Sequence, residues 1–279
     1  ISNYLKVNKN SNKIKSRYDF INICNNFDGY NKGKKKFNLK VQFLEQPLTD
    51  KAIVLISCDL NFFKIFAKNF LKKFRYKNNN VVHFHVITNR KNELIDKFNS
   101  LNTNFGALGL TCEKSKKKKN KIFITMSRFL ICSYIMKNYK NDVFINDIDF
   151  SPNYKLDLIS KILIAKKSDV GLYDENQRIP WTTYAAGCCY FRYKRKLAII
   201  FLNKLSCYYR YKLENPKYTF WTVDQLGLYL IVGKMKKNFK IMNFYNFKNI
   251  INFNKLLKVS KFLEIKKVTA KFKNGHPNE

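Results

Sequence analysis

Several features that would assign this chain quickly to a known class of protein are missing from its sequence. No apolar run is long enough to span a membrane as a helix, because Lys or Asn residues interrupt the apolar stretches. The chain has only three His residues, and none of its seven Cys residues forms a Cys-x-x-Cys pair. The sequence therefore predicts neither a zinc site nor a disulfide framework, and we interpret the cysteines as reduced core thiols of a cytoplasmic protein.

Acidic residues are also few, with 19 Asp and Glu against 54 Lys and Arg, which gives a net charge of +35. Such an excess is typical of nucleic-acid-binding proteins. However, Lys, Asn, Ile, Phe and Tyr are all over-used together, as an A/T-rich genome would produce, and Arg is scarce although phosphate and base recognition favours it. We therefore do not expect nucleic acid as the partner. The positive field would still attract anionic nucleotide-sugars, acidic glycans or, by peripheral contact, an anionic membrane.

The composition leaves ample material for a packed core, since 46% of the residues are hydrophobic and 16% are aromatic. Patterning along the chain predicts three parts. Residues 1–45 are an N-terminal Lys/Asn-rich arm or the end of a preceding module, residues 46–250 form one domain, and residues 251–279 are a C-terminal extension. No internal repeat and no interdomain linker is visible.

The first well-patterned segment predicts a βαβ unit. Residues 52–59 begin with a continuous apolar run that suits a strand buried on both faces. Phe63, Phe66, Phe70 and Phe74 then recur at helical spacing, and residues 81–88 read as a second strand. Such a unit implies parallel strands joined by a right-handed crossover. Further helices are expected at 93–98, 127–138, 197–211 and 222–232, and further strands at 105–110, 143–145, 169–173 and 185–193. The fold class is therefore α/β, a mixed and mostly parallel sheet flanked by helices in a single domain.

An Asp-x-Asp pair, Asp147 and Asp149, directly follows the short apolar strand at 143–145. Two acids in this position repel each other and are partly desolvated, and a divalent cation removes both costs. Carboxylate oxygens favour Mg²⁺ or Mn²⁺, which usually bind together with a phosphate-bearing substrate. The end of a strand in an open α/β sheet is where such ligands normally bind.

Four elements, taken in order, resemble a known family. They are Ser57-Cys58-Asp59, Arg128, Asp147-x-Asp149, and residues 186–192 paired with Trp221-Thr222-Val223-Asp224-Gln225. Over residues 50–235 the chain resembles the GT-A type of nucleotide-sugar glycosyltransferase, which has a Rossmann-like sheet, and is most similar to glycosyltransferase family 8 and related nucleotide-diphospho-sugar transferases. The resemblance implies metal-dependent transfer of a hexose from a nucleotide-diphosphate sugar, in first place a UDP-sugar, to a glycan or lipid-linked acceptor.

The resemblance also implies roles for residues that would bind the donor. Asp147 and Asp149 would hold Mn²⁺ or Mg²⁺ against the diphosphate, with Asp147 also facing the ribose. Arg128 would lie beside the nucleotide or its phosphates, and Gly187 would let the backbone approach the sugar. His276 resembles the late His that completes the metal shell in family 8.

Asp224 and Gln225 would lie at the reaction centre, Asp224 as the base if the enzyme inverts configuration and Gln225 near the reacting carbon. Asp224 could equally serve in the first turn of a helix, where the dipole favours an acid. Asp59 could contact the nucleobase or ribose, or instead cap the helix that follows it. In one respect the sequence departs from the family, because Ala185 stands where Asn or Asp is usual.

Two other classes of function remain open. A metal-dependent nuclease or nucleotidyltransferase could use the same acid pair, but it would need a third carboxylate, for which Asp157 and Asp169 are candidates. A degenerate transferase domain that binds sugar without turnover is compatible with Ala185. His83 and His85 lie on the same face of one predicted strand, but no nearby acid or Cys makes them a metal site.

Overall fold

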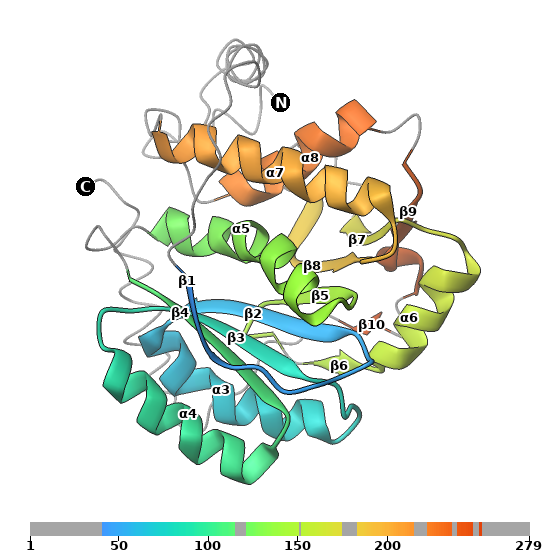
Figure 1. The fold of residues 1–279 in the computed structure, drawn as a ribbon. Helices are drawn as coiled ribbons and strands as arrows, with labels where there is room; N and C mark the ends of the chain where they lie inside the picture. Colours follow the sequence, from blue (N-terminus) through green and yellow to red (C-terminus); the bar gives the residue numbers. More distant parts are fainter. Residues whose placement is uncertain are drawn as a thin grey trace, which may run out of the picture.

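A single mixed sheet forms the centre of the protein (Figure 1). The computed structural model describes residues 41–114, 121–150, 152–174, 183–214, 222–235, 239–247 and 251–252. Eight strands lie in the order β1-β4-β3-β2-β5-β8-β7-β9. Their bounds are β1 Val41–Glu45, β2 Ile53–Asp59, β3 Val82–Ile87, β4 Leu108–Glu113, β5 Val143–Asn146, β7 Val170–Asp174, β8 Tyr184–Phe191 and β9 Ile241–Asn243. Pairs β4–β3, β3–β2, β2–β5 and β7–β9 are parallel, and β1–β4, β5–β8 and β7–β8 are antiparallel. This sheet confirms the predicted α/β class.

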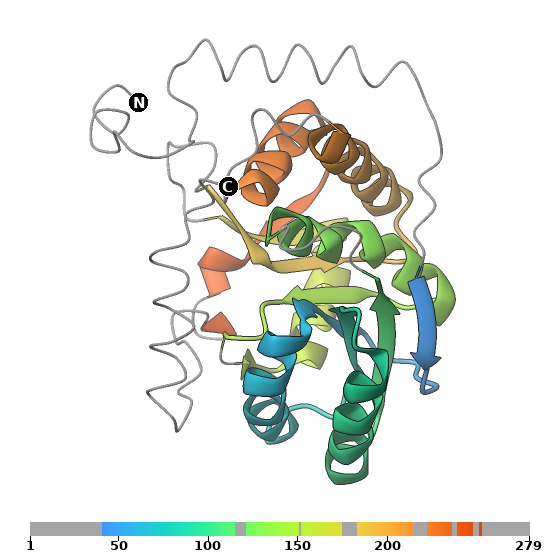
Figure 2. The same ribbon diagram turned by 90° about the vertical axis from the view of Figure 1, so that its left-hand side faces the viewer.

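Helices cover both faces of the sheet, so the molecule has three layers (Figure 2). The elements beside the sheet are α3 Leu60–Arg75, α4 Lys91–Phe105, α5 Lys121–Tyr139, α6 Leu156–Ala165, α7 Lys196–Glu214, α8 Val223–Met235 and the short 3-10 helix η2 Phe244–Phe247. Buried residues of α5, α7 and α8 form one core with one face of the sheet, and those of α3, α4 and α6 form a second core with the other. A separate two-stranded sheet pairs β6 Asn153–Tyr154 with β10 Ile251–Asn252. None of the helices described is long and apolar enough to cross a bilayer.

The predicted βαβ unit is present as β2, α3 and β3. The continuous apolar run of β2 is buried because its alternate side chains enter the two cores, Ile53 and Leu55 on one side and Val54 and Ile56 on the other. The four phenylalanines of the α3 stripe are all buried against the sheet. Strands β2 and β3 pair in parallel, as predicted. The unit therefore places the carboxyl end of β2 directly beside the start of α3.

Helix α6 and strand β1 are among the elements that the sequence did not predict, as are the short β6, β9, η2 and β10. Helix α6 was missed because its apolar residues are not confined to one stripe, so that Leu158 and Ile164 are exposed while Ile159 and Leu163 are buried. Strand β1 falls in the segment expected to be an arm, and the sheet therefore begins at Val41, before the boundary expected at residue 46. It is a half-buried edge strand, which leaves little trace in the sequence.

The strand expected at residues 105–110 begins later in the chain. Helix α4 continues to Phe105 and ends at Gly106, which has a φ of +58°. Strand β4 therefore runs over Leu108–Glu113 instead of 105–110. Residues 115–120, part of the run of charged residues that follows this strand, lie outside the described residues.

Candidate functional site

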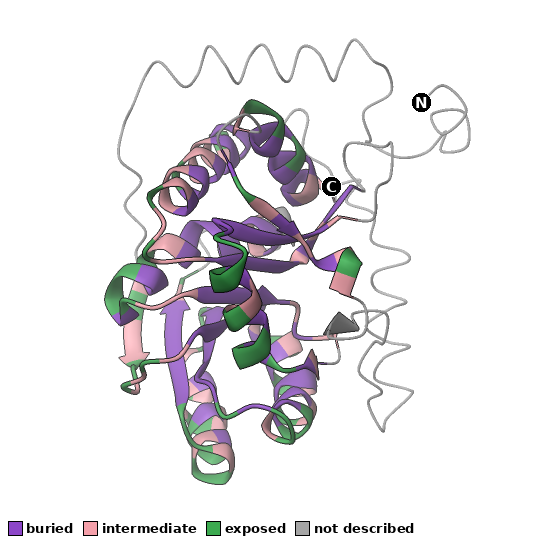
Figure 3. Ribbon diagram, turned by 90° about the vertical axis from the view of Figure 1, so that its right-hand side faces the viewer, coloured by how far each residue is buried: buried purple, intermediate pink, exposed green. Residues whose placement is uncertain are grey.

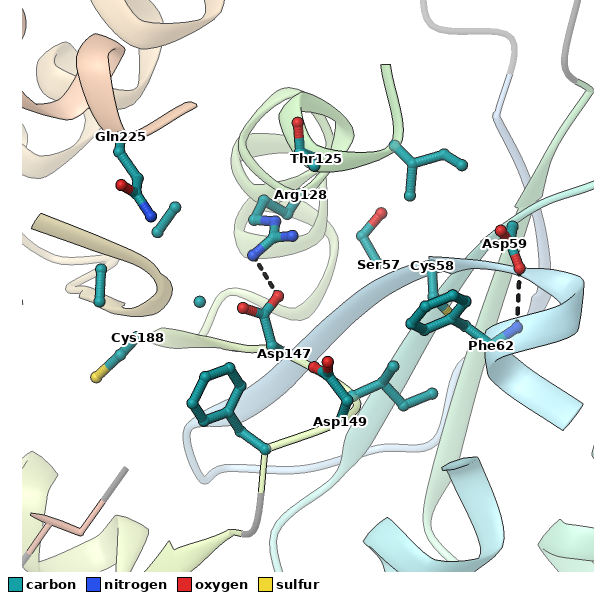
Figure 4. Close-up of a pocket in the computed structure, with 16 residues that line it drawn as sticks. Ser57, Cys58, Asp59, Phe62, Thr125, Arg128, Asp147, Asp149, Cys188 and Gln225 are labelled. Carbon is teal, nitrogen blue, oxygen red and sulfur yellow. Dashed lines mark hydrogen bonds and ion pairs between the residues drawn. The ribbon is translucent and has the colours of Figure 1, made fainter. Parts of the chain in front are cut away.

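A cavity of about 360 Å³ opens at the carboxyl ends of β2 and β5. Parallel strands end at the same edge of a sheet, which is why these two segments meet there. The start of β8 joins them because β8 pairs antiparallel with β5, with Asn146 opposite Cys188. Helices α5 and α8 supply the remaining wall, including Thr125, Arg128 and Gln225 (Figure 4). The predicted site residues that line the cavity are Asp59, Arg128, Asp147, Asp149, Gly187 and Gln225.

Asp147 is fixed in place from two sides. Its backbone N–H donates to the carbonyl of Gly187 at 3.2 Å, and Arg128 donates to its Oδ1 in an ion pair (Figure 4). A Cβ added at Gly187 would overlap Asp147 Oδ2. Glycine is therefore required here for the close approach of the carboxylate, which is a different reason from the donor contact that the resemblance implied.

Arg128 is the buried cation of the site. Burial by itself would lower the pKa of its guanidinium, but Asp147 and Asp224 raise it above the ordinary value. Its Nε is buried and has no hydrogen-bond acceptor among the described residues. A buried N–H without an acceptor is costly, so this cation is held in the site at some expense of stability.

Asp149 and Asp224 are the two carboxyl groups of the site whose pKa is raised. Burial and the neighbouring Asp147 raise the pKa of Asp149 to about 6. Burial likewise raises the pKa of Asp224 to about 6, with Arg128 opposing the shift and Asp147 adding to it. One arginine thus faces three carboxylates, which makes the carboxylate side of the cavity attractive to a further cation.

The acid pair fits a divalent cation that brings other ligands with it. Among the described residues no group of three or more His, Cys, Asp or Glu side chains could hold a metal. Mg²⁺ is usually held by one or two carboxylates together with water and substrate phosphates, and two carboxylates are what Asp147 and Asp149 provide. A cation here would therefore need oxygens from a bound diphosphate and from water.

The two residues expected at the reaction centre are placed differently. Gln225, in the first turn of α8, lines the cavity. Asp224 is buried behind it and is not among the residues that line the cavity. Its Oδ1 accepts from the Gln225 N–H at 2.9 Å, and its carbonyl accepts from the Tyr209 hydroxyl at 2.9 Å. Access of Asp224 to a substrate would therefore require α8 to shift.

Asp59 has the capping role, and its contact with a nucleobase or ribose stays a prediction. Its Oδ1 accepts from the Phe62 N–H at 2.8 Å and so caps α3, while its side chain also lines the cavity (Figure 4). Ala185 lies at the cavity wall with no polar side chain, in line with its departure from the family pattern.

Several cavity residues were not predicted as site residues. Thr125 lies one helical turn before Arg128 and therefore shares its face of α5. Ser57 lies two residues before Asp59 on β2, and its hydroxyl is 2.6 Å from that of Ser127. The spacing of Thr125 from Arg128 and of Ser57 from Asp59 in the sequence could have indicated that both residues belong to the site.

The other candidates lie elsewhere. Asp157 pairs with Lys51 at 3.5 Å, and buried Asp169 accepts from Arg195 Nε at 2.7 Å, so neither is a third carboxylate of the cavity. His83 and His85 are buried and both bond to Thr111. The expectation that no acid lies near them was wrong, because Glu113 Oε2 is 3.6 Å from His85 Nε2, but no group of three or more potential metal ligands forms among the described residues. Trp221 and His276 lie outside the described residues.

Comparison with known proteins gives partial matches to glycosyltransferase structures. No family model matches the chain, and no curated protein matches it significantly. The apo form of mouse xyloside xylosyltransferase 1 is 9% identical, with 70% of this chain and 86% of that chain covered and a TM-score of 0.43. GlyE of Streptococcus pneumoniae TIGR4 is 14% identical, with 81% and 50% covered and a TM-score of 0.45, so this chain spans about half of GlyE. An active-site mutant of LgtC is 15% identical, with 63% and 70% covered and a TM-score of 0.45.

Xyloside xylosyltransferase 1 and GlyE are glycosyltransferases by name. With TM-scores of 0.43 to 0.45, the likeness extends to part of the chain trace and says nothing about the substrate of this protein.

Proposed function

We propose that this protein is a metal-dependent glycosyltransferase. It moves a hexose from a nucleotide-diphosphate sugar to a glycan or lipid-linked acceptor, and a UDP-sugar is the first candidate for the donor. The observation that carries the proposal is the position of Asp147 and Asp149 after β5, where both line a cavity that they share with the buried Arg128. Mutually repelling carboxylates favour a divalent cation, and a cation beside a buried guanidinium favours a diphosphate.

Five residues of the cavity would take part in binding such a donor. Asp147 and Asp149 would hold the cation, which when bound acts as a Lewis acid towards the departing nucleoside diphosphate. Arg128 keeps Asp147 oriented through its ion pair, and its positive charge at the cavity wall would attract the diphosphate. Because Gly187 has no side chain, it leaves room for the Asp147 carboxylate. The Gln225 amide, which lines the cavity, can hydrogen-bond to the sugar or to the acceptor.

A second candidate is a domain that binds the nucleotide-sugar without turning it over. Two observations favour it. Ala185 offers the sugar no hydrogen bond, and Asp224, the proposed base, lies outside the lining of the cavity. A nuclease is less well supported, because neither Asp157 nor Asp169 reaches the acid pair to complete a set of three carboxylates.

Calorimetric titration with UDP, with and without Mn²⁺, tests donor binding. We expect the parent protein to bind UDP in a metal-dependent manner and Asp149→Ala to weaken that binding by roughly tenfold or more. Asp96→Ala, which removes an exposed carboxyl from α4, is the matched control and should bind like the parent. A folded sample that binds no nucleotide under any metal condition would contradict the proposal.

Turnover separates the enzyme from the sugar-binding domain. In the presence of Mn²⁺ and a mixture of glycan acceptors, the parent protein should release UDP from a UDP-hexose faster than Asp149→Ala does. Metal-dependent UDP binding without any release above the variant's level would favour the second candidate.

A further inference from the structure

The most exposed large apolar side chains lie at the end of the sheet opposite the cavity. Leu48, Tyr76, Leu158 and Ile164 are 40–99% exposed, more than any other large apolar residue among those described. Leu48 is in the loop that precedes β2, Tyr76 is the C-cap of α3, and Leu158 and Ile164 are on α6. They form what we call the α6 patch. Exposed apolar residues that gather in this way commonly mark an interaction surface.

Hydrogen bonds hold the three segments together. Lys51, between Leu48 and β2, donates to Asn79 Oδ1 at 2.8 Å and pairs with Asp157 of α6 at 3.5 Å. Asn78, in the turn after Tyr76, donates to the carbonyl of Tyr154 at 2.9 Å and accepts from the Leu156 N–H at 2.8 Å. These contacts lie before the first residues of β2 and β3, at the amino ends of the parallel strands. The loop before β2, the turn after α3 and the start of α6 are therefore joined at this end of the sheet, although they are far apart in the chain.

The outer face of α6 mixes apolar and basic residues. Leu156, Ile159 and Leu163 face the core, and the opposite face is exposed in a view from the side on which α6 lies (Figure 3). Leu158 and Ala165 are seven residues apart and therefore lie along one line of the helix surface. The helix therefore has one face buried in the core and the other face free, with aliphatic and basic side chains on the free face.

Lysines dominate the charge around the patch. Lys155, Lys161, Lys166 and Lys167 are exposed on or next to α6, and Lys77 follows Tyr76. The acids in these segments are Asp50, in the loop before β2, and Asp157, the only acid of α6. Asp157 is already paired with Lys51 and accepts from Asn80 at 3.0 Å. The patch thus presents a net positive charge interleaved with aliphatic side chains.

We propose that the α6 patch docks the protein on an anionic lipid surface, with α6 lying parallel to the bilayer. The lysines complement the charge of acidic headgroups, and the aliphatic side chains and Tyr76 can enter the interfacial region. Exposed Leu158 and Ile164 favour lipid over a nucleic acid, which would be bound by Arg and by stacked aromatic rings. Because the patch is at the amino ends of the strands, docking leaves the cavity at the carboxyl ends facing the water.

Co-sedimentation of the full chain with vesicles tests the proposal. Vesicles of phosphatidylcholine with phosphatidylserine should sediment the protein at low salt, and pure phosphatidylcholine vesicles should not. Leu158→Ser with Ile164→Ser, and separately Lys155→Glu with Lys161→Glu, should each weaken binding at least roughly tenfold. The matched control is Lys64→Glu with Lys68→Glu on the exposed face of α3, in the half of the helix away from Tyr76, which makes the same charge change away from the patch and should bind like the parent. Melting curves establish that all three variants are folded.

Three outcomes would overturn the proposal. The parent protein does not bind anionic vesicles, or the patch variants bind them as the parent does, or the α3 control loses binding to the same extent and so reports only net charge. A single-stranded oligonucleotide serves as the counter-probe. If the patch variants lose oligonucleotide binding while retaining vesicle binding, the surface belongs to a nucleic acid instead.

Discussion

Gly187 is the cavity residue with the least room for a side chain, because a Cβ there would overlap the Asp147 carboxylate. We predict that Gly187→Ala displaces Asp147 from Arg128 and weakens UDP binding in the presence of Mn²⁺ by roughly tenfold or more. Calorimetry measures this change. Gly233→Ala in α8 is the control, since a Cβ there meets no atom within 4 Å. It should leave binding unchanged and stabilise the protein by about 1 kcal/mol, because alanine is the better helix former.

Asp224 should make the protein lose stability as the pH rises. Its pKa is raised from the ordinary 3.8 to about 6 by burial, so that between these values the unfolded chain loses this proton before the folded protein does. From pH 4.5 to 7.5 this group should lower the free energy of unfolding by about 2 kcal/mol. Asp224→Asn should remove that part of the pH dependence in urea unfolding. A variant with the same pH dependence as the parent would show that Asp224 is not the group responsible.

Helix α3 begins at a residue that also lines the cavity, and substitutions can separate the two roles of Asp59. Asp59→Ala removes the cap and should cost about 1 kcal/mol of stability in urea unfolding, whereas Asp59→Asn keeps an acceptor for the Phe62 N–H. If Asp59 contacts the nucleotide through its charge, both variants should weaken UDP binding although only the first is destabilised. If both variants bind UDP as the parent does, Asp59 only caps the helix.

Elements with a regular pattern could be predicted from the sequence, and those without one could not. The apolar run of β2 and the phenylalanine stripe of α3 identified the βαβ unit because burial imposes a period on the residues. Helix α6 has apolar residues on its outer face as well as its inner face, and therefore has no such period. The strands that carry the acid pair and Gly187 were both predicted. Their antiparallel pairing, which brings Gly187 against Asp147, was not predicted from the motifs.

Across the whole molecule, the net charge of +35 should oppose compaction. The lysines repel one another, and there are too few acids to pair with them. We predict that the melting temperature rises by a few degrees between low salt and about 0.3 M NaCl, because salt screens this repulsion. Differential scanning calorimetry measures the rise, and KCl at the same ionic strength should give the same rise, because screening depends on ionic strength and not on which of the two salts supplies it. A melting temperature that falls with salt would indicate that attractive ion pairs outweigh the repulsion.

The cavity is walled by α5 and α8 from one helical layer, by α3 from the other and by three strands of the sheet between them. Unfolding either layer would therefore destroy it, so a ligand that fills it can bind only the native protein. Such a ligand must delay thermal unfolding, by about 2.7 kcal/mol when its free concentration is a hundred times its dissociation constant. Thermal unfolding of the protein therefore reports whether a ligand binds in the cavity. A panel of nucleotides and nucleotide-sugars, each with and without Mn²⁺, can be ranked by the melting temperature alone, before any acceptor is known.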